Sequence, residues 1–229
     1  MITTIGLRKI AGVASAAALS GAIASATIIE FNHFTSNGAT IPTDYASRVD
    51  ASGNDVGGRT GFDLTYDPTP NVAVQMFSAD YQGGSWNQIG SLNWWSTQYA
   101  NLSGIAYHSP SNQGARFIFT ADTGYWVRLH QFQMGSWPNV NRTLPFLQVV
   151  VDGTPVYTQN NVVISGSTAN TFSFDPDVVK GGVIEIRFGG DWNVGIDNIG
   201  FSQAIVPEPA SWLVLGAGLA GLMRLRRRD

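Results

Sequence analysis

Asp197 is the carboxylate whose setting in the sequence is hardest to reconcile with burial. It lies in the run Ile196-Asp197-Asn198-Ile199, which is otherwise rich in apolar side chains. A bare carboxylate is costly to remove from water unless something compensates its charge. Asp197 must therefore bind a cation such as Ca²⁺, which prefers oxygen ligands, or accept backbone hydrogen bonds at a strand end, or face solvent. These alternatives stay open at this point.

Four tryptophans in Gly- and Asn-rich segments are the candidate ligand-binding side chains. They are Trp86, Trp94, Trp95 and Trp137. Exposed aromatic rings could stack on the C–H groups of sugar rings and so bind a glycan. Long loops also need anchors, and tryptophans commonly supply them by packing onto a core. We favour anchoring for these residues and keep sugar stacking as the alternative.

The residues of common catalytic centres do not form a recognisable pattern in this sequence. His33, His108 and His130 are far apart and lack the spacing of metal ligands. The sequence contains no Gly-x-Ser-x-Gly, His-Glu-x-x-His or phosphate-loop motif. A glycosidase could draw its acid and base from aspartates, but no pair stands out. We expect a protein that is not an enzyme; the alternative is a secreted polysaccharide-active glycosidase or lyase.

The elements that must position these residues are β-strands. Short apolar stretches are separated by turn residues, and no helical pattern of three turns separates them. In residues 183–188, Val183, Glu185 and Arg187 alternate with Ile184, Ile186 and Phe188, which is typical of a strand with one buried face. We predict strands at Thr27–His33, Val72–Phe77, Arg116–Thr120, Tyr125–Gln133, Phe146–Val151, Thr171–Phe174, Val183–Phe188 and Val194–Phe201.

These strands predict an all-β fold, an antiparallel β-sandwich of the jelly-roll type. Asp152-Gly153 favours positive φ and predicts a tight turn between two strands. Residues 34–60 and 78–115 are polar and rich in turn residues, so we expect long loops with short strands there. An N-terminal signal helix and a C-terminal hydrophobic helix are expected to flank the sandwich.

Charge and cysteine content exclude several classes of protein. Residues 27–206 hold seven basic and fourteen acidic side chains, a formal charge of −7. An acidic body argues against binding nucleic acid or anionic lipid. The absence of cysteine rules out disulfides, thiol catalysis and cysteinyl zinc sites.

The N-terminal residues 1–26 have the features of a secretory signal peptide. Arg8 and Lys9 precede an apolar stretch of small residues, and Ala24-Ser25-Ala26 follows it. Small side chains at Ala24 and Ala26 match the A-x-A rule of signal peptidase, which predicts cleavage before Thr27. The expected domains are a signal peptide at 1–26, a sandwich ectodomain at 27–203 and a sorting tail at 204–229.

The C-terminal tail combines proline, an apolar run and a basic end. Pro207 and Pro209 disfavour a regular helix, and the uncharged run Ser211–Met223 follows them. This run is shorter than the roughly 20 residues that span a bilayer. Basic residues remain cytoplasmic, so the tail is expected to enter the inner membrane from outside. The basic residues are Arg224, Arg226, Arg227 and Arg228.

This tail resembles the PEP-CTERM sorting signal of Gram-negative bacteria, in which a Pro-Glu-Pro motif, a short hydrophobic helix and an Arg-rich end follow one another. The resemblance covers residues 205–228 and makes Pro207, Glu208 and Pro209 recognition residues for an exosortase. It implies an exported protein that is transiently anchored in the inner membrane. The expected destination is the cell surface or the extracellular matrix of an exopolysaccharide-producing bacterium, with exopolysaccharide as a partner.

The body resembles galactose-binding-like and carbohydrate-binding-module jelly rolls, through the stretches LQVVVDGTPVYTQ and IEIRFGGDWNVGIDNIGFSQ. In those folds a late strand carries a pair such as Asp197-Asn198, and the first strand carries an acid such as Glu30. The first and last strands are commonly neighbours. The resemblance therefore implies a structural calcium ion shared by Glu30 and Asp197, and a body that could bind glycans without catalysis.

Overall fold

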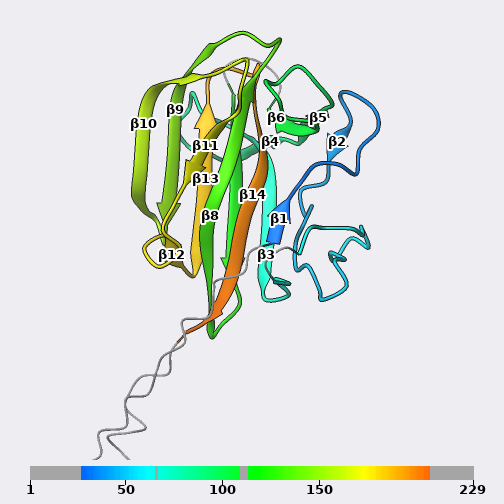
Figure 1. Cartoon of the computed structure of the whole chain (residues 1–229). Helices are drawn as coiled ribbons and strands as arrows, with labels where there is room; N and C mark the ends of the chain where they lie inside the picture. Colours follow the sequence, from blue (N-terminus) through cyan, green and yellow to red (C-terminus); the bar gives the residue numbers. More distant parts are fainter. Residues whose placement is uncertain (1–26, 65–66, 109–112, 207–229) are drawn as a thin grey trace, which may run out of the picture.

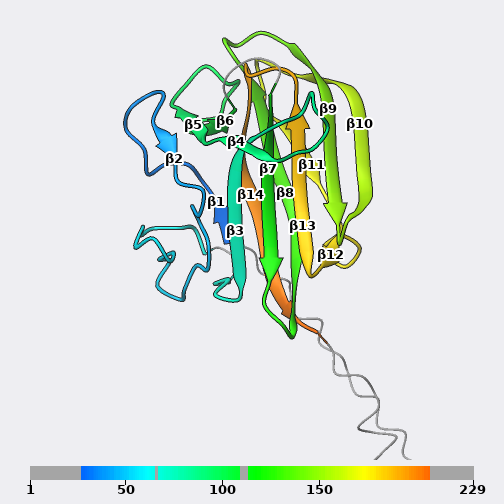
Figure 2. The same cartoon turned by 180° about the vertical axis from the view of Figure 1, so that it is seen from behind.

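Alternating apolar residues build two antiparallel β-sheets that pack face to face. Figure 1 shows the molecule from the side of one sheet, and Figure 2 shows it from the side of the other. The computed structural model describes residues 27–64, 67–108 and 113–206. The expected signal peptide with Ala24 and Ala26, and the tail from Pro207 onward, lie outside the described residues. Within the described ranges, no helix is long and apolar enough to cross a membrane.

The first sheet has eight strands, with β8 and β14 at its centre. Its order is β11-β8-β14-β6-β5-β2, while β1 also pairs with β14 and β12 with β8. The strands are β1 (Thr27–Ile29), β2 (Thr40–Ile41), β5 (Leu92–Trp95), β6 (Ile105–Tyr107), β8 (Tyr125–Ser136), β11 (Asn170–Ser173), β12 (Lys180–Gly181) and β14 (Val194–Ile205).

The second sheet has six strands in the order β10-β9-β13-β7-β3-β4. Several consecutive strands lie in opposite sheets, for example β7 and β8, β8 and β9, and β13 and β14, which is the connectivity of a jelly roll. The strands are β3 (Val72–Ala79), β4 (Gln88–Gly90), β7 (Gly114–Ala121), β9 (Arg142–Val151), β10 (Thr154–Ile164) and β13 (Val183–Gly189). The predicted all-β antiparallel sandwich is confirmed.

The core lies between the sheets and is rich in phenylalanine. Phe119 of β7 and Phe201 of β14 face each other across the layers, with ring centroids 4.9 Å apart. Phe117 packs beside Phe188 within the second sheet, and all four side chains are fully buried. Burying one such side chain contributes about 1.5–3 kcal/mol. Ile184, Ile186 and Phe188 of β13 are fully buried, as the alternation predicts, whereas Val183 and Arg187 are partly exposed and Glu185 is 8% exposed.

The predicted turn joins β9 to β10. Asp152 and Gly153 have φ values of 47° and 80°, which suit a two-residue hairpin loop. The Asp152 side chain also accepts a hydrogen bond of 2.8 Å from the backbone N–H of Val183, which ties the hairpin to β13. Residues 34–60 form mainly loops beside the sandwich, where the blue-to-cyan chain lies in Figure 1.

The first strand is shorter than predicted because its partner bulges. β1 pairs with β14 from Thr27↔Phe201 to Ile29↔Ile199, so Glu30 would oppose Asn198. Asn198 has a φ of 50°, and the register of β14 against β8 shifts between Asp197 and Gly200. The Glu30 carbonyl instead accepts a hydrogen bond of 2.7 Å from the Tyr45 hydroxyl. At its other end β14 continues to Ile205, past the expected body boundary at residue 203.

Candidate functional site

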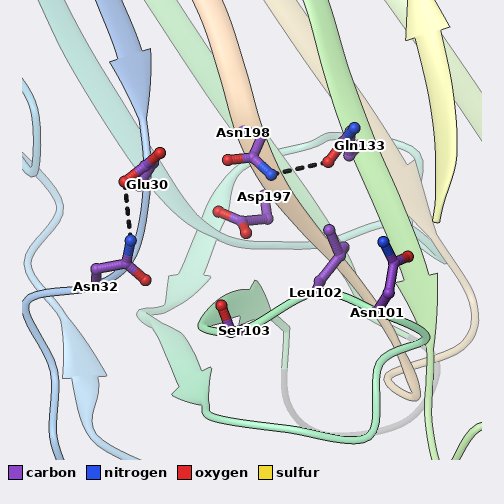
Figure 3. Close-up of a pocket in the computed structure, with 8 residues that line it drawn as sticks. All are labelled: Glu30, Asn32, Asn101, Leu102, Ser103, Gln133, Asp197 and Asn198. Carbon is purple, nitrogen blue, oxygen red and sulfur yellow. Dashed lines mark hydrogen bonds between the residues drawn. The ribbon is translucent and has the colours of Figure 1, made fainter. Parts of the chain in front are cut away.

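A polar pocket of about 250 Å³ lies where β1 and β14 separate (Figure 3). One lining residue is apolar and the other seven carry oxygen in their side chains. The lining residues are Glu30, Asn32, Asn101, Leu102, Ser103, Gln133, Asp197 and Asn198. They come from the end of β1, from the loop between β5 and β6, and from β8 and β14. The site thus joins four segments that are distant in the sequence.

The bulge in β14 shapes this pocket. Asn198 adopts left-handed backbone geometry, which Asn tolerates better than most residues. Its side-chain amide donates a hydrogen bond of 2.8 Å to Oε1 of Gln133 on β8, as Figure 3 shows. The extra residue in the strand lets both Asp197 and Asn198 line the pocket, whereas strict alternation would place them on opposite faces.

Asp197 is a buried carboxylate with an uncompensated oxygen. Its side chain points from β14 into the pocket (Figure 3), and the residue is 4% exposed. Burial, with a smaller contribution from the nearby charge of Glu30, raises the pKa of Asp197 to about 8. Backbone hydrogen bonds from Asn198 and Phe31 act in the opposite direction but are outweighed. Oδ1 of Asp197 is buried and has no hydrogen-bond partner among the residues that the structure describes.

Glu30 is the second carboxylate of the pocket. Its Oε2 accepts a hydrogen bond of 2.8 Å from the side-chain amide of Asn32. The two acids that the resemblance to other jelly rolls paired, Glu30 and Asp197, therefore line the same pocket. Asn101, Ser103 and Gln133 were not predicted as pocket residues, because nothing in the local sequence distinguishes them from other polar residues.

The pocket residues fit a calcium ion. Ca²⁺ takes six to eight oxygen ligands from carboxylates, amides and water. The unpartnered Oδ1 of Asp197 is an acceptor that a cation would satisfy, and side-chain oxygens surround it. Among the described residues, no three His, Cys, Asp or Glu side chains gather as a metal-binding group. Most of the ligands would therefore be neutral oxygens and water.

A second pocket, which we call the aromatic slot, is lined by Trp95, Tyr99, Trp137 and Trp192 and has a volume of about 100 Å³. The Trp137 ring lies 6.3 Å from that of Trp95 and 6.2 Å from that of Trp192. Tyr99 is buried at 2% exposure, whereas the three tryptophans are partly exposed. Burial raises the pKa of the Tyr99 hydroxyl, so this residue stays neutral.

Hydrogen bonds to the backbone of its wall residues hold the aromatic slot. The Tyr99 hydroxyl lies 3.5 Å from the backbone carbonyl of Trp192. Nε of Arg142 donates a hydrogen bond of 3.1 Å to the backbone carbonyl of Trp137. The backbone N–H of Trp137 donates to the carbonyl of Asn193 at 2.8 Å, which links two walls of the slot. Rings fixed in this way need little ordering when a ligand binds.

The tryptophans singled out in the sequence separate into two groups. Trp95 and Trp137 line the aromatic slot. Trp94 is 6% exposed in the main core, and Trp86 is 8% exposed against Tyr81 and Phe146 beside the second sheet. Trp192 completes the slot. Its position directly after Gly189-Gly190-Asp191, in a turn, was the feature of the sequence that could have indicated a slot residue.

The histidines serve structural contacts. His33 contacts the Tyr45 hydroxyl and the Thr60 carbonyl, and His108 is fully buried against Phe188. Nε2 of His130 lies 2.8 Å from Oγ of Ser202. Burial lowers the pKa of His130, and Arg128 lowers it further. Ser202 is only 2% exposed, so this Ser–His contact is closed to a substrate.

Comparison with protein families identifies the tail. Residues 206–228 match the PEP-CTERM protein-sorting motif. The chain therefore carries a sorting signal that implies export, an exosortase as its processing partner, and a cell-surface or extracellular destination in Gram-negative bacteria. A comparison with curated proteins found no match.

Two solved structures show distant similarity to the body. A structure described as "CBM4 structure and function" is 12% identical, with a TM-score of 0.33, and covers 71% of this chain and 100% of its own. CBM32-3 from a family 31 glycoside hydrolase of Clostridium perfringens is 10% identical, with a TM-score of 0.28, and covers 77% and 95%. Similarity at this level assigns neither a ligand nor an activity to this chain.

Proposed function

We propose that this exported, exosortase-sorted protein binds a polysaccharide through the aromatic slot and catalyses no reaction. The observation that carries the proposal is the convergence of Trp95, Trp137 and Trp192 around Tyr99. Partly exposed indole rings offer flat apolar faces, and their rigid side chains lose little entropy on binding. Such faces match the C–H faces of sugar rings. The acidic body favours a neutral glycan over a polyanionic one.

A binding survey across glycans tests this proposal. We expect the mature protein to bind at least one polysaccharide, and Trp95→Ala or Trp137→Ala to weaken binding by at least tenfold. Trp126→Ala is the matched control, because Trp126 is also partly exposed and lies at the opposite end of β8, about 36 Å from Trp137 at 3.3 Å per residue. Equal losses in all three variants would show that the slot is not the binding site.

The polar pocket is proposed to hold a structural calcium ion with Glu30 and Asp197 as its charged ligands. A bound Ca²⁺ would replace the missing partner of Asp197 Oδ1 and remove the repulsion between the two acids. Glu30 follows β1 and Asp197 lies on β14, so the ion would tie the first strand to the last. Addition of Ca²⁺ should raise the melting temperature above that in EDTA, and no change would exclude the ion.

One observation favours an enzyme as the second candidate. Glu30 and Asp197 share a pocket, and the raised pKa of Asp197 is a property of general acids in glycosidases. Among the described residues, however, no aromatic side chain lines this pocket to hold a sugar ring, and no carboxylate lines the aromatic slot. Release of new reducing ends from polysaccharide by the wild type but not by Asp197→Asn would establish the enzyme instead.

The termini are proposed to direct the protein to its site of action. Signal peptidase would cleave after Ala26, and the apolar run 211–223 would hold the tail in the inner membrane until exosortase acts near Pro207-Glu208-Pro209. The body would then reach the cell surface or the polysaccharide matrix. Mass spectrometry of the mature C-terminus, with and without exosortase, tests this order. An intact arginine block at 224–228 in both strains would refute processing.

A further inference from the structure

One segment, which we call the bridging loop, contributes to both pockets. It is the stretch 96–104 between β5 and β6. Asn101 and Ser103 line the polar pocket, and Tyr99 lines the aromatic slot. Leu102 lines the polar pocket and also packs in the aromatic cluster that surrounds the slot. Trp95, another wall of the slot, directly precedes the loop.

Internal hydrogen bonds make the bridging loop a tight unit. The backbone N–H of Gly104 donates to Ser96 O, and that of Leu102 donates to Tyr99 O, both at 3.1 Å. Gln98 and Ala100 have φ values of 70° and 56°. Non-glycine residues adopt this left-handed backbone at a cost in energy, which the surrounding contacts must offset. A displacement at Asn101 would therefore be transmitted to Tyr99, two residues away.

The bridging loop also contacts residues that lie close to the walls of the slot. Gly135 of β8 has no side chain, and a Cβ there would clash with the carbonyl oxygen of Tyr99. The backbone N–H of Asn139, two residues after Trp137, donates a hydrogen bond of 3.0 Å to Gln98 O. The Asn101 side-chain oxygen accepts a hydrogen bond of 2.7 Å from the N–H of Ala169, which packs against the aromatic cluster.

We infer that the polar pocket regulates the aromatic slot: Ca²⁺ in the pocket fixes the bridging loop through Asn101 and Ser103, and the fixed loop holds Tyr99 and Trp95 in the geometry that binds a polysaccharide. A carbonyl oxygen has two lone pairs, so the Asn101 oxygen can approach a cation and keep its bond to Ala169. This inference rests on the proposed glycan-binding function of the slot. By thermodynamic linkage, a bound polysaccharide must raise the affinity for Ca²⁺ by the same factor.

Calorimetric titrations with Ca²⁺ and EDTA test the coupling in the mature protein. We expect Ca²⁺ to lower the Kd for a polysaccharide bound by the wild type by at least about fivefold, the lower end of typical coupling between sites. Substitutions of two pocket asparagines form a matched pair, since Asn101 belongs to the bridging loop and Asn32 does not. Asn32→Ala should need more Ca²⁺ but keep the full gain at saturation. Asn101→Ala should lose the gain and still bind polysaccharide in EDTA.

Hydrogen–deuterium exchange gives a readout that needs no polysaccharide. Ca²⁺ should slow exchange at the amides of Leu102 and Gly104 in the wild type and in Asn32→Ala, but not in Asn101→Ala. An unchanged Kd with and without Ca²⁺ would overturn the coupling and leave glycan binding intact. Absence of polysaccharide binding in both buffers would refute the proposed function, and exchange in the loop would still decide whether Ca²⁺ fixes the bridging loop. If Ca²⁺ produced no heat of binding in the titration and no change in hydrogen–deuterium exchange, the inference would be overturned.

Discussion

Replacing Asp197 by Asn should stabilise the cation-free protein at alkaline pH and have little effect in acid. The pKa of Asp197 is about 8 in the folded protein, against an ordinary value of 3.8. Between these values the folded state binds a proton that the unfolded state has lost, so the stability of the wild type falls as pH rises through this window. Asn has a similar shape and does not titrate.

The difference of about 4 pKa units corresponds to about 5–6 kcal/mol at about 1.36 kcal/mol per unit, fully expressed above pH 8. Asp197 is 4% exposed, so solvent screens this effect little. Urea unfolding in EDTA at pH 4.5, 6 and 8 measures it. The advantage of Asp197→Asn should be small at pH 4.5 and reach several kcal/mol at pH 8.

Asp177→Asn is the control for this series, because the Asp177 side chain is 71% exposed. Saturating Ca²⁺ should make the wild type more stable than Asp197→Asn, because the ion stabilises the folded state to which it binds. The Asp197→Asn variant lacks one charged ligand and should gain less stability from the ion. Parallel pH curves for the wild type and Asp197→Asn in EDTA would refute the reasoning, because they would mean that the carboxylate ionises without cost in the folded state.

Three further substitutions test the packing. Phe117→Ala should lower the free energy of unfolding by about 3–5 kcal/mol, measured by urea denaturation, because it opens a cavity between the sheets. Gly135→Ala should increase hydrogen exchange in the bridging loop by pushing Tyr99 away, whereas Gly90→Ala, with its nearest atom 3.9 Å away, should not. Glu185→Gln should cost about 1–3 kcal/mol at pH 7, since it leaves two arginines facing each other. Burial raises the pKa of Glu185, but hydrogen bonds from these arginines lower it overall, so the contribution of Glu185 should be lost as pH falls below its ordinary value of 4.5.

The sandwich could be predicted because its signals are local. Alternating apolar residues in Val183–Phe188 and the turn pair Asp152-Gly153 each define an element within a few residues. The end of β1 could not be predicted, because it depends on a bulge at Asn198 in a strand at the other end of the chain. The pairing of β6 with both β5 and β14 is likewise set by contacts between distant segments.

The candidate site was predictable only where one residue contrasted with its neighbours. Asp197 contrasts with the apolar residues around it, and Glu30 entered through resemblance to other jelly rolls. Asn101 and Ser103 are ordinary loop residues in sequence and gain significance because the bridging loop approaches β14. Trp86 and Trp95 occupy similar Gly- and Asn-rich contexts, yet one is buried and the other lines the slot. Tertiary contacts alone separate them.

Oxidative footprinting of tryptophan tests glycan binding at the aromatic slot most directly, because it locates the ligand on the unmodified mature protein. Trp137 and Trp192 line the slot, whereas Trp126 lies at the far end of β8 against Lys180. A saturating polysaccharide should slow oxidation of Trp137 and Trp192, quantified by mass spectrometry, and leave the rate at Trp126 unchanged. Equal oxidation of Trp137 and Trp192 with and without bound polysaccharide would contradict the assignment of the slot as the binding site.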